Sequence, residues 1–164
     1  MCIRDRSDVV ELTLVLAREM LDAAGVNGKD PEEALKDGSA MDHWRRMVKA
    51  QGGDPDAPLP TARETKIIRA DRDGVISSMN ALQVGISAWR LGAGRERQGE
   101  SVQAGAGIEI HAKPGDQIKK GETLFSLHTD EAARFERAEA ALEGAVVIGS
   151  HVAEHLPLVI AKID

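Results

Sequence analysis

Residues 115–124, GDQIKKGETL, form the sharpest local motif of the sequence. Its two glycines, Gly115 and Gly121, stand where tight turns need a positive φ or a close approach of backbone. Ile118 and Leu124 are the apolar residues beside these turns, and we expect both to point into a small, barrel-like sandwich of strands. The stretch therefore predicts short strands joined by tight turns.

The pattern of apolar and polar residues on both sides of this stretch predicts further strands and two helices. The expected strands are Thr65–Ala70, Val75–Met79, Ile108–Ala112, Thr123–His128, Ala145–Ile148 and Leu158–Ile163. The expected helices are Ala81–Leu91, which Gly92 ends, and Asp130–Leu142. Residues 71–74 should form the turn of a hairpin that joins the first two strands. Strands interrupted by a helix indicate an α+β domain with a mixed sheet.

Helices precede this domain. The first runs from Ser7 or Asp8 to Gly25, and its apolar residues cover most of its circumference, so it needs covering on several sides. A second helical stretch follows over 31–50, divided by Gly38. Since the second stretch cannot cover the first alone, we expect that a covering surface lies outside this chain.

The sequence divides into four parts. Residues 1–7 fit no cap or helical period and are predicted to be a non-native leader. Residues 8–53 form a helical lead-in, residues 54–64 a proline-rich linker, and residues 65–164 the C-terminal domain.

Composition excludes several classes of protein. The formal net charge of −6 and the 2% aromatic content, without tyrosine, argue against a nucleic-acid partner. No apolar run approaches the roughly 20 residues of a membrane span, so no membrane partner is expected. The single cysteine, Cys2, suits a reducing compartment, and we expect a cytoplasmic protein.

The glycine turns of residues 115–124 resemble those of lipoyl and biotinyl carrier domains, whose barrel-sandwich hybrid fold has hammerhead turns. A carrier of that kind holds its cofactor on a lysine at an exposed hairpin tip. Here Glu131 occupies the corresponding position, and no Met-Lys-Met biotin site occurs. The resemblance therefore implies the fold, while a carrier or binding module remains the alternative function.

Two groups of glycines and the five histidines also invite a functional interpretation. The glycines of residues 91–95, LGAGR, follow a helix, whereas phosphate-binding loops open one, so a helix end is predicted. Glycines 105 and 107 precede a strand and predict a turn or bulge. The five histidines lie in different elements without metal-ligand spacing, so no metal site is expected. They are His43, His111, His128, His151 and His155.

Several blocks, taken together in their order, resemble the C-terminal part of the thymidine/pyrimidine-nucleoside phosphorylase family, from about Asp8 to Asp164. The blocks are ELTLVLAREML (11–21), DGSA (37–40), MVKAQGG (47–53), DGVI (73–76), RLGAGR (90–95) and GIEIHAKPGD (107–116).

That family cleaves pyrimidine nucleosides with phosphate, giving the free base and a pentose 1-phosphate. Its phosphate loop, of Lys-His-Ser-Thr-Gly-Gly type, and its base-binding set of Arg, Ser and Lys lie upstream, and neither pattern occurs in this sequence. The resemblance therefore implies a structural fragment that is inactive alone, with no catalytic, substrate-binding, cofactor-binding or metal residue and no cofactor. Its implied partners are the N-terminal part of the same enzyme and a second copy in a homodimer. A scaffold that pairs with a separate catalytic chain is a further possibility.

Overall fold

The computed structural model describes residues 7–151 and 157–163. The chain forms two compact units, residues 1–57 with 156–164 and residues 58–155, which we call the helical unit and the sheet unit. Each is described by itself. In the described part of the chain, no helix combines the length and the apolar character that crossing a membrane requires.

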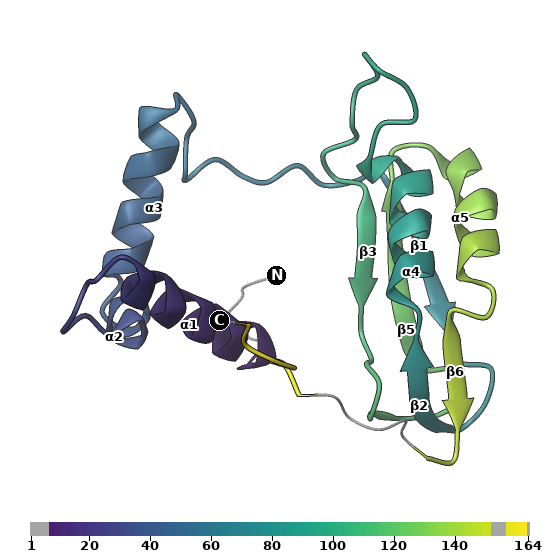
Figure 1. Ribbon diagram of the computed structural model, residues 1–164. Coiled ribbons are helices and arrows are strands. Elements are labelled where there is room, and N and C mark those ends of the chain that lie inside the picture. The colour runs from purple at the N-terminus through teal and green to yellow at the C-terminus, as the bar shows by residue number, and fades with distance from the viewer. Residues whose placement is uncertain (1–6, 152–156, 164) are drawn as a thin grey trace. The chain divides into compact units, whose positions relative to one another are not determined.

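The described part of the helical unit contains three helices, which are α1 (Ser7–Ala23), α2 (Pro31–Lys36) and α3 (Ser39–Ala50) (Figure 1). Asp30 caps α2, because its Oδ1 accepts a hydrogen bond of 3.0 Å from the Glu32 N–H. Gly38, with φ +86°, separates α2 from α3, so the predicted division is confirmed. Arg18 of α1 contacts both Asp30 and Glu32 at 3.5 Å, which links α1 to α2.

Much of the apolar surface of the helical unit is uncovered. Leu14 is buried, whereas Leu16 is 54% and Met20 73% exposed in the same helix. Within the helical unit, α2 and α3 therefore leave part of the apolar surface of α1 uncovered.

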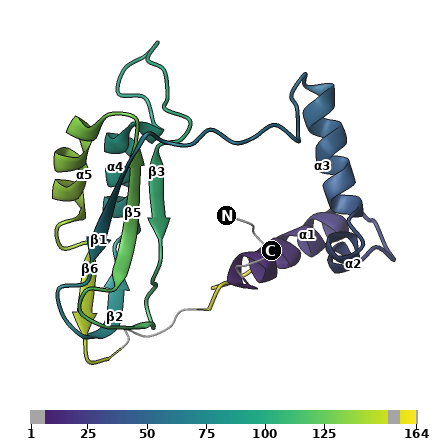
Figure 2. The same cartoon turned by 180° about the vertical axis from the view of Figure 1, so that it is seen from behind.

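Within its described residues, 58–151, the sheet unit contains six strands, two helices and two single turns of other helix types. They are β1 (Glu64–Arg69), β2 (Gly74–Met79), α4 (Ala81–Ala88), the π-helical turn η2 (Trp89–Ala93), β3 (Gly107–Ile110), β4 (Gln117–Ile118), β5 (Thr123–Thr129), the 3₁₀ turn η3 (Ala132–Arg134), α5 (Phe135–Leu142) and β6 (Val146–Gly149). The strands form two antiparallel sheets of three, in the orders β1-β5-β3 and β4-β2-β6 (Figure 2).

Three predictions about the strands are wrong. The α+β class is confirmed, but two antiparallel sheets replace the expected mixed sheet. Strand β1 does not form a hairpin with β2, because it pairs with β5 instead, with Glu64 opposite Thr129. The segment Leu158–Ile163 is not a strand, since the helical unit contains no described strand with which its backbone could pair.

The core of the sheet unit lies between the two sheets and the pair α4–α5. Phe125 and Leu127 of β5, Ile76 of β2 and Leu91 of η2 are at most 1% exposed. Ala138 of α5 is also fully buried, and its small side chain allows the close packing of α5 against α4.

Candidate functional site

The two glycine turns repeat one local arrangement. In the first, Lys113 N–H donates a bond of 2.8 Å to the Asp116 carboxylate, and Asp116 N–H donates back to Lys113 C=O at 3.0 Å. In the second, Lys119 and Glu122 make the same pair of bonds, at 2.7 and 3.0 Å. Gly115 and Gly121 have φ of +101° and +87°, which confirms the predicted turns.

Each turn also holds one residue of a neighbouring segment through two backbone hydrogen bonds. The first turn exchanges bonds with Ile76, which donates to Asp116 C=O and accepts from Gly115 N–H. The second turn does the same with Ala70, through Glu122 C=O and Gly121 N–H. The turns at Gly115 and Gly121 therefore clamp neighbouring segments, and the carboxylates of Asp116 and Glu122 accept hydrogen bonds from backbone N–H groups.

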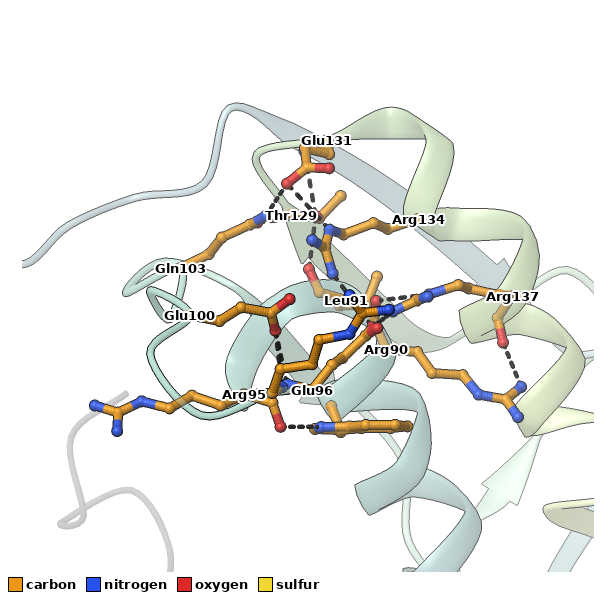
Figure 3. Close-up of polar contacts among 12 residues, drawn as sticks. Arg90, Leu91, Arg95, Glu96, Glu100, Gln103, Thr129, Glu131, Arg134 and Arg137 are labelled. Carbon is orange, nitrogen blue, oxygen red and sulfur yellow. Dashed lines mark hydrogen bonds and ion pairs between the residues drawn. The ribbon is translucent and has the colours of Figure 1, made fainter.

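Glu131 occupies the position at which a carrier domain would have its lysine (Figure 3). Glu131 Oε1 accepts a hydrogen bond of 2.7 Å from Gln103 Nε2 and lies 3.1 Å from Arg134 Nε. This residue has no amino group to carry a cofactor, and its carboxylate already has two partners.

A charged cluster around Glu96 anchors the segment 94–106 to the sheet unit. Glu96 forms ion pairs with both Arg134 and Arg137 (Figure 3). The base of the same segment is closed by Gln103 N–H, which donates to Gly92 C=O at 3.0 Å. The cluster pairs its charges internally, so we assign it an anchoring role.

Two histidines flank a carboxylate on the outer face of the β1-β5-β3 sheet. His111 Nε2 lies 2.7 Å from Ser126 Oγ, and His128 Nδ1 lies 3.0 Å from Thr65 Oγ1. Glu109 Oε2 is 3.9 Å from His111 Nε2 and 3.7 Å from His128 Nε2. A catalytic triad needs the nucleophile and the carboxylate hydrogen-bonded to opposite nitrogens of the imidazole. At His111 both Ser126 and Glu109 approach Nε2. At His128 the hydroxyl of Thr65 and the carboxylate of Glu109 approach opposite nitrogens, but the Glu109 oxygen is 3.7 Å away, which is beyond hydrogen-bond distance. The arrangement therefore does not form a triad.

The two other described histidines contact residues close to them in the sequence. Among the described residues, no group of three or more His, Cys, Asp or Glu side chains is arranged to hold a metal ion. His43 contacts Arg46 at 2.8 Å and His151 contacts the Ser150 carbonyl, while His155 lies outside the described residues.

The glycine predictions are confirmed. Gly92 has φ +111° and lies at the end of the helical stretch α4–η2, where a Cβ would meet the Gln103 carboxamide at 2.8 Å. Gly105 lies in a turn before β3, closed by a bond of 3.0 Å from Ala106 N–H to Gln103 C=O. Neither glycine opens a helix toward an anion.

An open hollow of about 340 Å³ lies between β1, β5, β6 and the end of α5. Most of its lining is apolar, including Phe125 and Ile148, and its one carboxylate is Asp71. Asp71 lies 2.7 Å from Arg72, and their hydrogen bonds lower the pKa of the Asp71 carboxyl and raise the pKa of the Arg72 guanidinium. The carboxylate is therefore committed to an ion pair.

Comparison with known proteins identifies the family of the sheet unit. Residues 75–149 match the family model of the pyrimidine nucleoside phosphorylase C-terminal domain. The sheet unit thus belongs to the class of pyrimidine nucleoside phosphorylase C-terminal domains. Beyond this domain, the chain is homologous to thymidine phosphorylase over most of its length.

The similarity to individual relatives extends into the helical unit. The chain is 47% identical over 156 residues to thymidine phosphorylase of Mycobacterium tuberculosis, which is 95% of this chain and 36% of the relative. It is 34% identical over 134 residues to the pyrimidine-nucleoside phosphorylase of Staphylococcus haemolyticus, covering 75% of this chain and 31% of that enzyme. The chain thus spans about a third of the length of these relatives and is related to their C-terminal portion.

Proposed function

We propose that this chain serves as the structural C-terminal portion of a thymidine/pyrimidine-nucleoside phosphorylase and catalyses no reaction alone. The complete enzyme would convert a pyrimidine nucleoside and phosphate into the free base and a pentose 1-phosphate. The observation that carries the proposal is the alignment with the mycobacterial thymidine phosphorylase. The two sequences are 47% identical over an alignment that covers 95% of this chain but only 36% of that enzyme.

The chemistry of the reaction supports an inactive chain. Phosphorolysis requires a phosphate ion held against C1′ of the sugar and a stabilised leaving base, which calls for converging cations and hydroxyl groups. In the sheet unit, Arg134 and Arg137 already pair with Glu96, and Arg72 pairs with Asp71. The carboxylates and cations of these clusters stabilise the domain, and we assign no catalytic or substrate-binding residue and no cofactor.

The helical unit supports a role in assembly. Met41, Trp44 and Met47 lie along one side of α3 and are each about half exposed, and Leu16 and Met20 of α1 are exposed too. Burying such side chains contributes about 1.5–3 kcal/mol each. We propose that residues 8–53 belong to the large lobe of the enzyme and pack against its N-terminal part, with 54–64 as linker and 65–164 as the C-terminal domain. The enzyme would be a cytoplasmic homodimer.

The sheet unit is proposed to have the barrel-sandwich hybrid fold, with the turns at Gly115 and Gly121 as its hammerhead turns. Their paired clamps on Ile76 and Ala70 support this. The alternative, a lipoyl- or biotinyl-like carrier, is disfavoured by Glu131. Intact-mass measurement discriminates between the two, because a carrier would gain the mass of its cofactor on a lysine.

The assembly role is tested by co-expressing this chain with the N-terminal part of the mycobacterial thymidine phosphorylase that lies upstream of the matched region. We expect the two chains to co-purify and the pair to release thymine from thymidine in phosphate buffer. The variant Trp44→Glu should abolish co-purification, whereas Leu82→Glu, at a side chain 72% exposed on α4, should not. Separate elution of the unmodified chains would contradict the proposal.

A further inference from the structure

The sequence contains two asparagines, Asn27 and Asn80, and the structure gives them opposite surroundings. Asn27 precedes Gly28 in the exposed segment between α1 and α2. Within the described residues, neither the Asn27 carboxamide nor the Gly28 N–H takes part in a hydrogen bond. The two groups that a side-chain-to-backbone reaction needs are thus adjacent, exposed and free.

We propose that Asn27 is a site of spontaneous deamidation through attack of the Gly28 backbone nitrogen on the Asn27 side chain. A bond forms between Gly28 N and Asn27 Cγ, and the bond from Cγ to the side-chain nitrogen breaks. The proton of the Gly28 amide leaves with that nitrogen as ammonia, and a five-membered succinimide remains. Water then adds to one of the two ring carbonyls, giving aspartate or isoaspartate at position 27. Nothing is oxidised or reduced, and water is the only co-reactant.

Gly28 makes this attack sterically easy. Glycine has no Cβ beside the attacking nitrogen, and its backbone changes conformation at little cost. Gly28 has φ +72°, and the space that a Cβ would occupy contains no atom within 4 Å. No atom therefore crowds Gly28 on the side that a Cβ would occupy.

Asn80 is the internal control. Its Oδ1 accepts hydrogen bonds from Leu82 N–H at 3.1 Å and from Gln83 N–H at 3.2 Å, as the N-cap of α4. The next residue, Ala81, has a Cβ and begins the helix. Rotation of the Asn80 carboxamide toward the following nitrogen would break both capping bonds, so this residue should persist.

Two Asp-Gly pairs in the chain are restrained in the same way. Asp37, before Gly38, accepts from Ser39 N–H at 2.8 Å, and Asp73, before Gly74, accepts from Lys120 N–H at 2.7 Å. Sequence alone presents Asn27, Asp37 and Asp73 as three similar side chains before glycine. The structure singles out Asn27 as the one whose side chain has no bond in the described part of the chain.

The reaction would change the connection between α1 and α2. It adds one negative charge to a chain of formal charge −6, close to Asp30, the N-cap of α2. The isoaspartate form also lengthens the backbone before Asp30 by one methylene.

The test incubates the full chain in a mildly alkaline buffer and follows it by tryptic peptide mass mapping. Trypsin separates the two asparagines into the peptides 19–29 and 73–90. We expect the peptide 19–29 to gain, with time, the mass difference between an amide and a carboxylate, while the peptide 73–90 stays unchanged. Methylation by an isoaspartyl methyltransferase should identify isoaspartate in the first peptide.

Two variants complete the test. Asn27→Gln should lose the converted form of the peptide, because attack would need a larger ring, and Gly28→Ala should slow the conversion. An unchanged peptide 19–29, under conditions that convert a synthetic peptide of the same residues, would overturn the proposal. Conversion of Asn80 at the same rate would also overturn it, because the capping hydrogen bonds of Asn80 would then not protect that residue.

Discussion

Thr129 donates a hydrogen bond of 2.7 Å from its buried hydroxyl to the carbonyl oxygen of Leu91. The same hydroxyl accepts from Glu131 N–H at 3.2 Å (Figure 3). One side chain thereby joins the end of β5 to the end of the helical stretch α4–η2. Because both residues are fully buried, the carbonyl of Leu91 has no access to water as a replacement donor.

Replacing Thr129 by Val should destabilise the chain by about 1–3 kcal/mol, because valine keeps the shape but leaves the Leu91 carbonyl without its donor. The measurement is the midpoint of urea unfolding followed by tryptophan fluorescence. Thr61→Val is the matched control, since Thr61 is exposed and its hydroxyl has no hydrogen bond to the described residues, and a surface change should stay within about 0.5 kcal/mol. Equal effects of the two substitutions would contradict the assigned role of Thr129.

The packing of the core leads to a second prediction. Leu127 is fully buried, so Leu127→Ala should lower the free energy of unfolding by about 2–5 kcal/mol through lost burial and the cavity left behind. Leu82→Ala removes the same atoms from a side chain that is 72% exposed and should have little effect. A small loss for Leu127→Ala in urea unfolding would show that the packing between the sheets is loose.

The anchoring role of the charged cluster predicts local rather than global effects. Replacing Arg137 by Met removes an ion pair with Glu96 and should accelerate amide hydrogen exchange in the segment 94–102. Because exposed ion pairs contribute about 0.2–1 kcal/mol, the urea midpoint should move little. Arg95→Met, at an exposed side chain in the same segment, is the control and should leave exchange unchanged.

The hydrogen-bonded carboxyl of Asp37 leads us to expect that acid lowers the helix content of the helical unit. Hydrogen bonds from the backbone N–H and the side chain of Ser39 lower the pKa of the Asp37 carboxyl. A carboxyl with a lowered pKa stabilises the folded form above its unfolded pKa, and that contribution is lost as the pH falls through the folded pKa. Helical circular dichroism should therefore decrease below about pH 4, and the decrease should be smaller in Asp37→Asn. Identical titrations of the two proteins would contradict this contribution.

Local sequence signals predicted much of this fold because their causes are local. A glycine at a positive φ ends a helix or makes a turn whatever surrounds it, so Gly38, Gly92, Gly115 and Gly121 were placed correctly. The partners of strands depend on distant residues instead. Residues 71–74 resemble a hairpin turn, but β1 continues into the clamp between Ala70 and the turn at Gly121, which commits it to β5.

The same distinction holds for the candidate sites. The identity of Glu131 in the sequence was enough to disfavour a carrier function. Its partners were not predictable, since Gln103 is 28 residues away and no periodic pattern connects the two. An Asn-Gly pair also indicates an ordinary turn, so the sequence alone does not single out Asn27. Among the described residues, its lack of a side-chain hydrogen bond distinguishes it from Asn80.

A phosphorolysis assay shows whether this C-terminal portion lacks the chemistry of the enzyme. The purified full chain is incubated with thymidine, and separately with uridine, in phosphate buffer, and release of the free base is followed by chromatography. The proposal predicts no thymine or uracil above a blank without protein, while the mycobacterial thymidine phosphorylase releases thymine under the same conditions. Measurable release by this chain alone, retained after repurification, would contradict the proposal.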